Sequence, residues 1–543
     1  MDPVIVVGAG PVGLSLSLAL ADQGVPSVLL DEGPGKDEPR PARTVVLHAD
    51  TAAALRRQGC VTLHDEAVRY TAWRTLRRRQ ETGRVTFEDH TAPLHLPQHA
   101  LTRALRAAAA GNPLITRVDQ VRVDVLEQDE RGVSAHTRGA ETTWWRGSHL
   151  VGCDGARSTV RKLLDIRFPG RTAVERHAVA ALRTELPWPG EAVLHRGLSG
   201  PAAEVTARPL ADGLWRLDWL LPARGELVTP DALVLLIRDT LAGWCGGATP
   251  PYDLVDTGVH TLHHRLARTW RVGRAFLAGD AAHLLGALGV QGVEEGLRDV
   301  ANLSWKLALD WRQGAPDALL DSYGAERRAA VAARLRAVDS AMPALRGGGG
   351  LRPWLPGASR SAESLLADAH LGRGALGAAP CYAPPGATCE VPVDTPLGEL
   401  VADVPVTTSD GATVPLTDLI GRGTCLVVLV APGTGVWDRR HWARAGLMPR
   451  LAETVESLPL PAELVVADGY PGAPAHTVLL IRPDGHLADT FAGVRPAELL
   501  AAADALRTGG TELPRPPRPR TDPDETPHAE PDPVTTPSGA VID

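Results

Sequence analysis

The sequence lacks paired cysteines, long apolar runs and clusters of basic residues. Its six cysteines contain no CxxC pair, so we expect reduced thiols and neither a disulfide framework nor a bound metal. No apolar stretch reaches the roughly 18 residues that a membrane-spanning helix needs. The first apolar segment, residues 4–20, is interrupted by a glycine-rich turn where a signal peptide would carry its apolar core. These absences predict a cytoplasmic protein that makes no use of a membrane.

The charge pattern and the missing hydrolase motifs argue against two further function classes. The net charge is −8 over 543 residues, and no Lys/Arg run is interleaved with aromatic residues, so nucleic acid is not an expected partner. We find no GxSxG or HExxH motif and no carboxylate pair that favours hydrolysis. A chain of this length is expected to form about three domains.

The first 31 residues predict a strand, a helix and a second strand around a GxGxxG turn. Gly8 allows the tight turn, Gly10 lets a pyrophosphate approach the backbone, and Gly13 lets the helix pack closely on the strand. The helix N-terminus then offers free N–H groups to phosphate. Asp31 closes the second strand, where its carboxylate can accept hydrogen bonds from ribose hydroxyls. The chain therefore begins with a predicted dinucleotide site.

Two later segments place further acids at predicted strand ends. Residues 150–158 end an apolar strand at Asp154-Gly155, and residues 275–283 end another at Gly279-Asp280. Because the carboxyl ends of strands in a Rossmann-type sheet converge on the ligand, both acids can meet ribose or ribityl hydroxyls. Taken singly, each acid is equally compatible with a helix N-cap or a turn. Their order after GxGxxG favours the ligand.

This order of motifs resembles the FAD-dependent aromatic hydroxylases, which are single-component flavoprotein monooxygenases with the para-hydroxybenzoate hydroxylase fold. The resemblance covers about residues 3–340 and is closest to the bacterial aromatic-polyketide hydroxylases. It implies an α/β protein with a Rossmann-type FAD-binding domain, an inserted β-sheet substrate domain and a thioredoxin-like C-terminal domain. FAD is the implied cofactor, and NAD(P)H visits as a transient co-substrate, since the chain has no second GxGxxG unit.

The resemblance also assigns individual positions to the FAD site. Asp31 matches the ribose-binding acid, Asp154 the Asp-Gly acid, and Asp280 the residue that reaches the ribityl chain. Arg43 and Gln98 match polar residues of the FAD cleft, although surface solvation or local capping explains each of them as well. The predicted cofactor-binding set is Gly8, Gly10, Pro11, Val12, Gly13, Asp31, Glu32, Arg43, Gln98, Asp154, Gly279, Asp280, Gly289, Gln291, Gly292, Val293 and Glu294. No catalytic side chain and no metal ligand is assigned.

The loop after Asp280 departs from the resemblance. It is rich in glycine and enters a predicted helix at Gly292, whose N-terminus would favour negative charge at flavin N1 and the C2 carbonyl. The family usually has two prolines where Gly286 and Ala287 stand, glycine at Val290, and often asparagine at Glu294. An ionised Glu294 beside N1 would oppose the reduced flavin, so we predict that it contributes backbone only and turns away, or is held protonated.

The predicted domain spans follow composition and patterning. The FAD-binding domain is predicted to consist of residues 1–171 and 259–345, with 73–97 contributing to the substrate side. The substrate sheet spans 172–258. It is followed by a linker over 346–395 with a short helix near residues 362–369, a thioredoxin-like domain over 396–510 that lacks CxxC, and a disordered tail over 511–543. Trp215 and Trp219 share one strand face, where core packing is favoured over stacking on substrate. His263, His264 and His283 have no metal-ligand spacing, so solvent or capping roles are expected.

The C-terminal domain shows three buried-strand patterns, at residues 426–430, 462–466 and 476–481, followed by a helix over 496–506. The segment after the first strand, residues 431–435, holds no cysteine, so thioredoxin-type disulfide chemistry is not expected. We predict a structural role, with a homodimer contact as one form of it.

These features predict an FAD- and NAD(P)H-dependent monooxygenase acting with O2 on a polycyclic aromatic, polyketide-like substrate through a flavin C4a-hydroperoxide, in secondary-metabolite biosynthesis. The altered loop at Gly286 leaves a Baeyer–Villiger or ring-rearranging oxygenase open. A flavin-binding partner protein without turnover is the alternative from another class.

Overall fold

The computed structural model describes residues 1–36, 38–78, 80–88, 91–197, 204–222, 228–286, 292–346, 368–369, 372–383, 387–433 and 448–510. The predicted linker helix near 362–369 lies almost wholly outside these residues, and the predicted disordered tail, Gly289 and Gln291 lie outside them altogether. Within the described ranges, no helix combines the length and the apolar character that crossing a bilayer requires.

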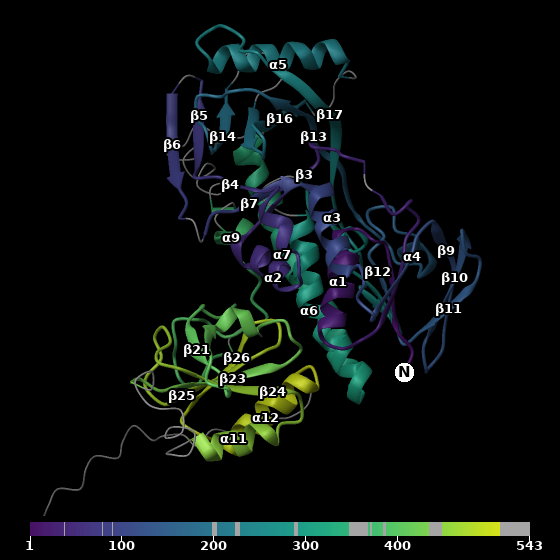
Figure 1. The fold of residues 1–543 in the computed structure, drawn as a ribbon, viewed down its shortest axis with the longest axis vertical. Helices are drawn as coiled ribbons and strands as arrows, with labels where there is room; N and C mark the ends of the chain where they lie inside the picture. The colour runs from purple at the N-terminus through teal and green to yellow at the C-terminus, as the bar shows by residue number, and fades with distance from the viewer. Residues whose placement is uncertain are drawn as a thin grey trace, which may run out of the picture.

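The molecule is a mixed α/β protein, as predicted, in which a parallel sheet lies between a larger antiparallel sheet and a separate C-terminal α/β unit (Figure 1). The parallel sheet has the strand order β18-β19-β12-β1-β2-β8. The bounds are β1 Val4–Val7, β2 Ser27–Leu30, β8 Ile115–Val118, β12 His149–Gly152, β18 Arg271–Val272 and β19 Ala275–Leu277.

The predicted strand-helix-strand unit at the N-terminus is confirmed. All four residues of β1 and of β2 are buried, because helix α1 and strands of a small antiparallel sheet, β9 (Val121–Gln128) and β11 (Trp144–Gly147), pack against them. Helix α1 (Pro11–Asp22) joins the two strands and packs against α3 (Gln98–Ala109) and α6 (Gly292–Gln313). Residue Val4 lies in register with His149 of β12 and with Ser27 of β2, so the carboxyl ends of these strands meet at one edge.

The larger sheet has the order β20-β17-β13-β16-β15-β14-β5-β6. Its strands are β5 Ala72–Arg77, β6 Gln80–Thr86, β13 Gly170–Arg183, β14 Glu191–Arg196, β15 Glu204–Pro209, β16 Leu214–Leu221, β17 Asp253–Leu266 and β20 His283–Leu284. The alternating segments around 192–195 and 214–220 are therefore strands, as predicted, and β17 extends the sheet past residue 258.

Helix α5 (Pro230–Trp244) covers one face of this sheet. Trp215 and Trp219 point into the core between them, where they are 5% and 0% exposed. The Trp219 Nε1–H donates to Thr240 Oγ1 of α5 at 2.9 Å. The prediction that these tryptophans serve core packing is confirmed.

Smaller elements join these two sheets. One three-stranded sheet has the order β3-β7-β4 and another the order β11-β10-β9. Their bounds are β3 Thr44–Leu47, β4 Val68–Arg69, β7 Leu94–Pro97, β9 Val121–Gln128, β10 Val133–Gly139 and β11 Trp144–Gly147. In the part of the chain before residue 380 that the structure describes, the remaining helices are α2 Ala49–Arg57, α4 Thr159–Leu163, α7 Asp317–Arg346 and α9 Gly374–Gly377, with 3₁₀ turns at Val61–His64 and Gly279–Ala281.

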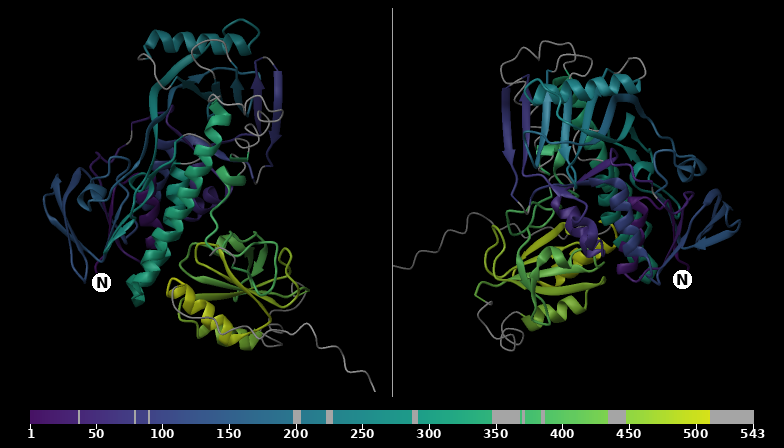
Figure 2. Two further views of the ribbon diagram at one scale, coloured as in Figure 1. Left: turned by 180° about the vertical axis from the view of Figure 1, so that it is seen from behind. Right: turned by 45° about the horizontal axis from the view of Figure 1, so that its top comes forward.

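The C-terminal unit is an α/β sheet with the order β22-β21-β24-β23-β25-β26. Its elements are β21 Pro405–Thr407, β22 Thr413–Pro415, a 3₁₀ turn Leu416–Leu419, β23 Cys425–Val430, α11 Met448–Glu456, β24 Ala462–Ala467, β25 Thr477–Ile481, β26 Leu487–Ala492 and α12 Pro496–Arg507. The three strands and the helix expected from the sequence are confirmed, and the thioredoxin-like assignment stays a prediction. Turned views place α11 and α12 on one side of this sheet (Figure 2).

Candidate functional site

The glycines of the first turn meet two different physical demands. Gly8 has φ +106°, and a Cβ there would lie 2.6 Å from the carbonyl oxygen of Cys153. A Cβ on Gly13 would lie 1.9 Å from the carbonyl oxygen of Gly8. A Cβ on Gly10, by contrast, would meet no protein atom within 4 Å. Packing thus requires Gly8 and Gly13, whereas Gly10 borders open space.

That open space lies at the N-terminus of α1, which Gly10 caps without a side-chain hydrogen bond and which has Pro11 in its first turn. The early N–H groups of a helix have no intrahelical acceptor and carry the positive end of the helix dipole. The turn is therefore suited to a pyrophosphate, and this chain's residues fit FAD at that position.

Asp31 holds the turn together from the end of β2. Its Oδ1 accepts from the Ala9 N–H at 2.8 Å, and its Oδ2 accepts from the Gly33 N–H at 3.0 Å. Glu32 beside it is exposed. A carboxylate oxygen can accept more than one hydrogen bond, so the predicted contact of Asp31 with ribose is compatible with this bracing role.

The structure brings Arg43 and Gln98 together, although they are 55 residues apart in the chain. The Arg43 Nε–H donates to Gln98 Oε1 at 2.8 Å, and the Gln98 N–H donates to the Arg43 carbonyl at 2.8 Å. Arg43 is exposed, and its positive charge partly offsets the rise that desolvation causes in the pKa of the Asp280 carboxyl. The two polar residues expected in the cleft are thus neighbours of the predicted ribityl-binding acid.

The Gly279-Asp280 turn lies against the N-termini of two helices. A Cβ on Gly279, at φ +61°, would lie 2.9 Å from Val12 Cγ2, and one on Gly296 of α6 would lie 2.5 Å from the same atom. A Cβ on Gly292, the first residue of α6, would lie 4.0 Å from Asp280 Oδ1. Desolvation by the surrounding protein raises the pKa of the Asp280 carboxyl, although the side chain is exposed. An exposed carboxyl group that is nevertheless desolvated by nearby protein atoms is typical of a cleft.

Asp154 makes the capping interaction that its sequence context left open. Its Oδ2 accepts from the N–H groups of Thr159 and Val160 at 2.6 and 3.0 Å, and its Oδ1 accepts from Ser158 Oγ at 2.5 Å. The carboxylate therefore satisfies the free N–H groups at the start of α4. A contact of Asp154 with FAD stays a prediction.

Two of the three histidines expected to meet solvent or cap local structure are instead buried beside carboxylates, and the expectation was wrong for them. His283 is 0% exposed, and its Nε2 lies 2.8 Å from Asp299 Oδ2. His264 is 5% exposed, and its Nδ1 lies 3.0 Å from Asp339 Oδ1. Sequence reasoning missed these pairs because their partners come from other elements, 16 and 75 residues away.

Asp299 is a supporting residue that the sequence reasoning did not single out. Its Oδ2 accepts from the Gly279 N–H at 2.9 Å, and its Oδ1 accepts from the Arg327 Nε–H at 2.8 Å. Arg327 also donates to Glu295 Oε2 at 2.7 Å, and Asp299 and Arg327 are 0% exposed. The sequence did carry one indication of this role, because Asp299 occupies a position that the apolar spacing of α6 predicts to be buried.

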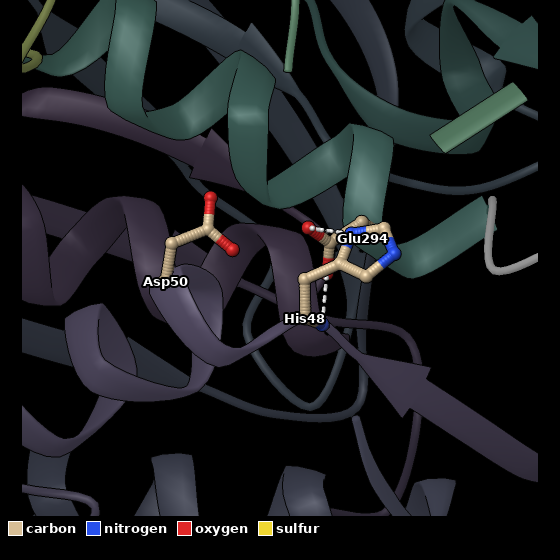
Figure 3. Close-up of side chains that lie close together, drawn as sticks. All are labelled: His48, Asp50 and Glu294. Atoms are coloured by element: carbon tan, nitrogen blue, oxygen red, sulfur yellow. Dashed lines mark hydrogen bonds and ion pairs between the residues drawn. The ribbon is translucent and has the colours of Figure 1, made fainter. Parts of the chain in front are cut away.

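Glu294 turns its side chain toward the β3–α2 segment (Figure 3). Its carboxylate accepts from Thr51 Oγ1 at 2.5 Å and from the His48 N–H at 3.3 Å, and it lies 3.3 Å from His48 Nδ1 and 3.5 Å from Arg298 Nη2. Burial opposes the charge, but His48 and Arg298 outweigh it and lower the pKa of Glu294. The predicted alternative of a protonated Glu294 is therefore wrong, because a histidine and an arginine stabilise the carboxylate.

Among the described residues, His48, Asp50 and Glu294 have ligand atoms within 4.8 Å of one another, which is the spacing of a metal site (Figure 3). Arg298 lies 3.4 Å from His48 Nδ1 and 3.5 Å from Glu294. Since a fixed guanidinium repels a metal ion, His48, Glu294 and Arg298 are better described as a buried ion-pair network, with Asp50 exposed beside them.

A family model described as an FAD binding domain matches residues 1–338. The 3-(3-hydroxy-phenyl)propionate/3-hydroxycinnamic acid hydroxylase of Paraburkholderia xenovorans (strain LB400) is 33% identical over 344 residues, covering 60% of this chain and 53% of that protein. Rifampicin monooxygenase of Streptomyces venezuelae is 35% identical over 352 residues, covering 60% of this chain and 68% of that protein. The chain spans about half the length of the hydroxylases that it matches.

Two solved structures are similar over nearly the whole chain. OxyS anhydrotetracycline hydroxylase from Streptomyces rimosus is 27% identical with a TM-score of 0.64, covering 94% of this chain and 99% of that chain. The flavin-dependent monooxygenase PieE, in complex with FAD and substrate, has a TM-score of 0.72 at 20% identity over 93% of this chain and 98% of that chain, and this likeness shows the fold. The family model covers more than half of the sequence, and the chain belongs to the family of FAD binding domain proteins.

Proposed function

We propose that the protein is an FAD-dependent monooxygenase that uses NAD(P)H and O2 to insert oxygen into a polycyclic aromatic, polyketide-like substrate in secondary-metabolite biosynthesis. One oxygen atom enters the substrate and the other leaves as water, with a hydride from NAD(P)H and a proton from solvent. The names of the relatives support the proposal, since they include aromatic-acid hydroxylases, rifampicin monooxygenase and anhydrotetracycline hydroxylase.

The observation that carries the proposal is the convergence of two helix N-termini on one open acid. Val12 of α1 and Gly292 of α6 both lie beside the Gly279-Asp280 turn, so two positive dipole ends and an acceptor for hydroxyl groups share one cleft. Phosphates, ribityl hydroxyls and an electron-rich ring are the ligand chemistry that this arrangement binds.

The protein's own residues bind and orient in this proposal. The α1 N-terminus beside Gly10 holds the pyrophosphate, Asp31 the ribose and Asp280 the ribityl hydroxyls, and the first turn of α6 faces the pyrimidine end of the flavin. When bound, FAD supplies the redox chemistry between NAD(P)H and O2. The eight-stranded sheet covers this region and excludes water from the substrate.

A ring-rearranging or Baeyer–Villiger oxygenation is a second candidate, and one observation favours it. Gly286 has φ +78°, and a Cβ there would lie 2.7 Å from His264 Nε2. Proline, with its φ fixed near −65°, cannot adopt this backbone. The position at which the aromatic hydroxylases usually carry proline therefore has a different backbone conformation in this chain.

The test is reduction of the bound flavin under anaerobic NADPH and NADH, with and without a panel of polycyclic phenols and quinones, followed by admission of O2. Reduction that one compound accelerates, with a product heavier by one oxygen atom, supports a monooxygenase, and the carbon skeleton of the product separates hydroxylation from rearrangement. Bound flavin that neither nicotinamide reduces would leave only a flavin-binding partner protein.

Several finer points remain proposals. They are NAD(P)H as the reductant, a homodimer, a cytoplasmic location, the thioredoxin-like identity of the C-terminal unit and the domain spans given from the sequence.

A further inference from the structure

The C-terminal unit shares a core with the FAD-site helices. Trp305 and Leu309 of α6 and Leu319 of α7 pack in one apolar cluster with Leu499 and Ala503 of α12. In the view from behind, the lower ends of the long helices lie beside this unit (Figure 2). The contact is thus part of a packed interior. The unit contains no CxxC motif, so we expect its role to depend on this contact and not on redox chemistry.

Beside this apolar contact, buried ion pairs connect α7 to the C-terminal unit. Arg482, 7% exposed, donates to Glu326 Oε1 and Oε2 at 2.7 and 2.9 Å and to Asp484 at 3.0 and 2.7 Å. Lys306 of α6 also reaches Glu326 at 2.8 Å. Glu326 immediately precedes Arg327, so these ion pairs fix the part of α7 that carries the buried guanidinium.

Tyr382 precedes the unit in the chain, packs against it and forms a second link. Its N–H donates to the Gly398 carbonyl at 2.9 Å, and its ring lies 4.3 Å from the His486 ring and 5.0 Å from the Arg482 guanidinium. Its hydroxyl oxygen accepts from Arg327 Nη1 at 3.3 Å. A tyrosine held by the C-terminal sheet therefore touches the arginine that pairs with Asp299.

The chain of contacts ends at the cofactor site. Arg327 orients Asp299, and Asp299 accepts from the Gly279 N–H at 2.9 Å. That hydrogen bond fixes the Gly279 turn, at φ +61°, that carries Asp280. The contacts are contiguous and the residues between the two ends are buried, so a change at Tyr382 can be transmitted to Asp280.

We propose that the C-terminal unit acts as a scaffold for the FAD site, with Tyr382 as a positioning residue that sets Asp280 through Arg327, Asp299 and the Gly279 turn. The inference depends on FAD binding and not on the oxygenation proposed above. A protein that binds FAD but shows no turnover would fail that proposal and leave this one testable.

The experiment measures the FAD dissociation constant of full-length apoprotein by quenching of FAD fluorescence, for Tyr382→Phe and a matched control. Tyr382→Phe removes one hydroxyl and keeps the ring contacts. The control is Tyr470→Phe, since Tyr470 lies in the C-terminal unit. Its hydroxyl contacts Thr395 Oγ1 at 2.6 Å and accepts from the Ala402 N–H at 3.0 Å. Both variants lose a buried hydrogen bond, but only Tyr382 is linked to α7.

Tyr382→Phe is expected to raise the FAD dissociation constant about 3- to 10-fold, which corresponds to the net contribution of one ordinary hydrogen bond, because the contact with Arg327 is long at 3.3 Å. It is also expected to change the visible circular dichroism of the bound flavin, because the environment of Asp280 shifts. Tyr470→Phe is expected to lower thermal stability and to leave both readouts unchanged.

Arg482→Gln tests the same link through another contact, because it removes the ion pair with Glu326 and keeps the Tyr382 hydroxyl. It is expected to weaken FAD binding as well. The proposal is overturned if Tyr382→Phe and Arg482→Gln both bind FAD within twofold of the wild type. It is equally overturned if Tyr470→Phe weakens FAD binding as much as Tyr382→Phe, because a general loss of stability would then explain the effect.

Discussion

Replacing Glu294 by glutamine tests whether this buried carboxylate is ionised and paired. The substitution keeps the shape of the side chain but removes its charge, so that Thr51, Arg298 and the His48 ring face a neutral carbonyl and the His48 N–H faces an amide N–H₂. Hydrogen bonds to a charged group contribute about 1.5–3 kcal/mol each to stability. Arg298 retains Glu295 at 2.7 Å, whereas His48 loses its carboxylate partner, and we expect a total loss of about 2–3 kcal/mol.

The pH dependence gives this prediction its sign. The pKa of Glu294 is lowered, so its contribution is present above its unfolded pKa of about 4.5 and is lost as pH falls through the folded pKa. The pKa of His48 is raised, with Glu294 the main cause opposing desolvation, so that contribution is present below about pH 6.5 and is lost as pH rises through the folded pKa. The stability difference between wild type and Glu294→Gln should therefore be largest between about pH 5 and 6.5.

Urea unfolding followed by tryptophan fluorescence at pH 5.5, 7 and 9 measures this difference. The matched control is Glu498→Gln, since Glu498 is exposed and pairs with Arg495 at the surface; its effect should stay within about 0.5 kcal/mol. A Glu294→Gln effect that is below 0.5 kcal/mol, or that is the same at pH 5.5 and pH 9, would refute the ionised pair.

Three further predictions follow from single contacts. Gly10→Ala should fold normally and bind FAD at least tenfold more weakly, because its Cβ enters open space where the phosphate is expected. Gly13→Ala should instead destabilise the apoprotein, since its Cβ would lie 1.9 Å from a carbonyl oxygen. Urea unfolding midpoints and FAD titration distinguish the two effects. Arg327→Met should cost about 3–5 kcal/mol in urea unfolding because it removes an ion-pair partner from two buried carboxylates, Glu295 and Asp299, while Arg336→Met, on the exposed side of the same helix, should be nearly silent. The pKa of His177 is raised to about 9, because two carboxylates outweigh desolvation. Its contribution to stability should therefore be full below about pH 6.5 and be lost as pH rises through about 9. A difference in unfolding midpoint between wild type and His177→Gln that is the same at about pH 6 and at about pH 10 would contradict this.

The sequence alone indicated the parts of the protein that depend on local rules. The GxGxxG turn, the strands on either side of it and the acid that follows them are short-range patterns, because the tight turn and the close helix packing demand glycine at fixed spacings. The alternating segment around Trp215 and Trp219 gave the correct strand and the correct buried face, because period two fixes which residues share a face. The strands of the C-terminal unit were found in the same way, from continuous apolar runs.

Only the tertiary structure decided which charged residues meet. Glu294 was expected either to turn away or to be protonated, and its contacts with Thr51 and His48 agree with the first alternative. Nothing in the sequence pointed to His48, which lies 246 positions away and stabilises the carboxylate. His283 and His264 looked like surface residues until burial beside Asp299 and Asp339 gave them partners. The energy of a buried charge depends on the neighbours that replace its water, and those neighbours come from elements that the folded chain brings together. The sequence determines where the dinucleotide turn can form, and the fold determines which charges stabilise it.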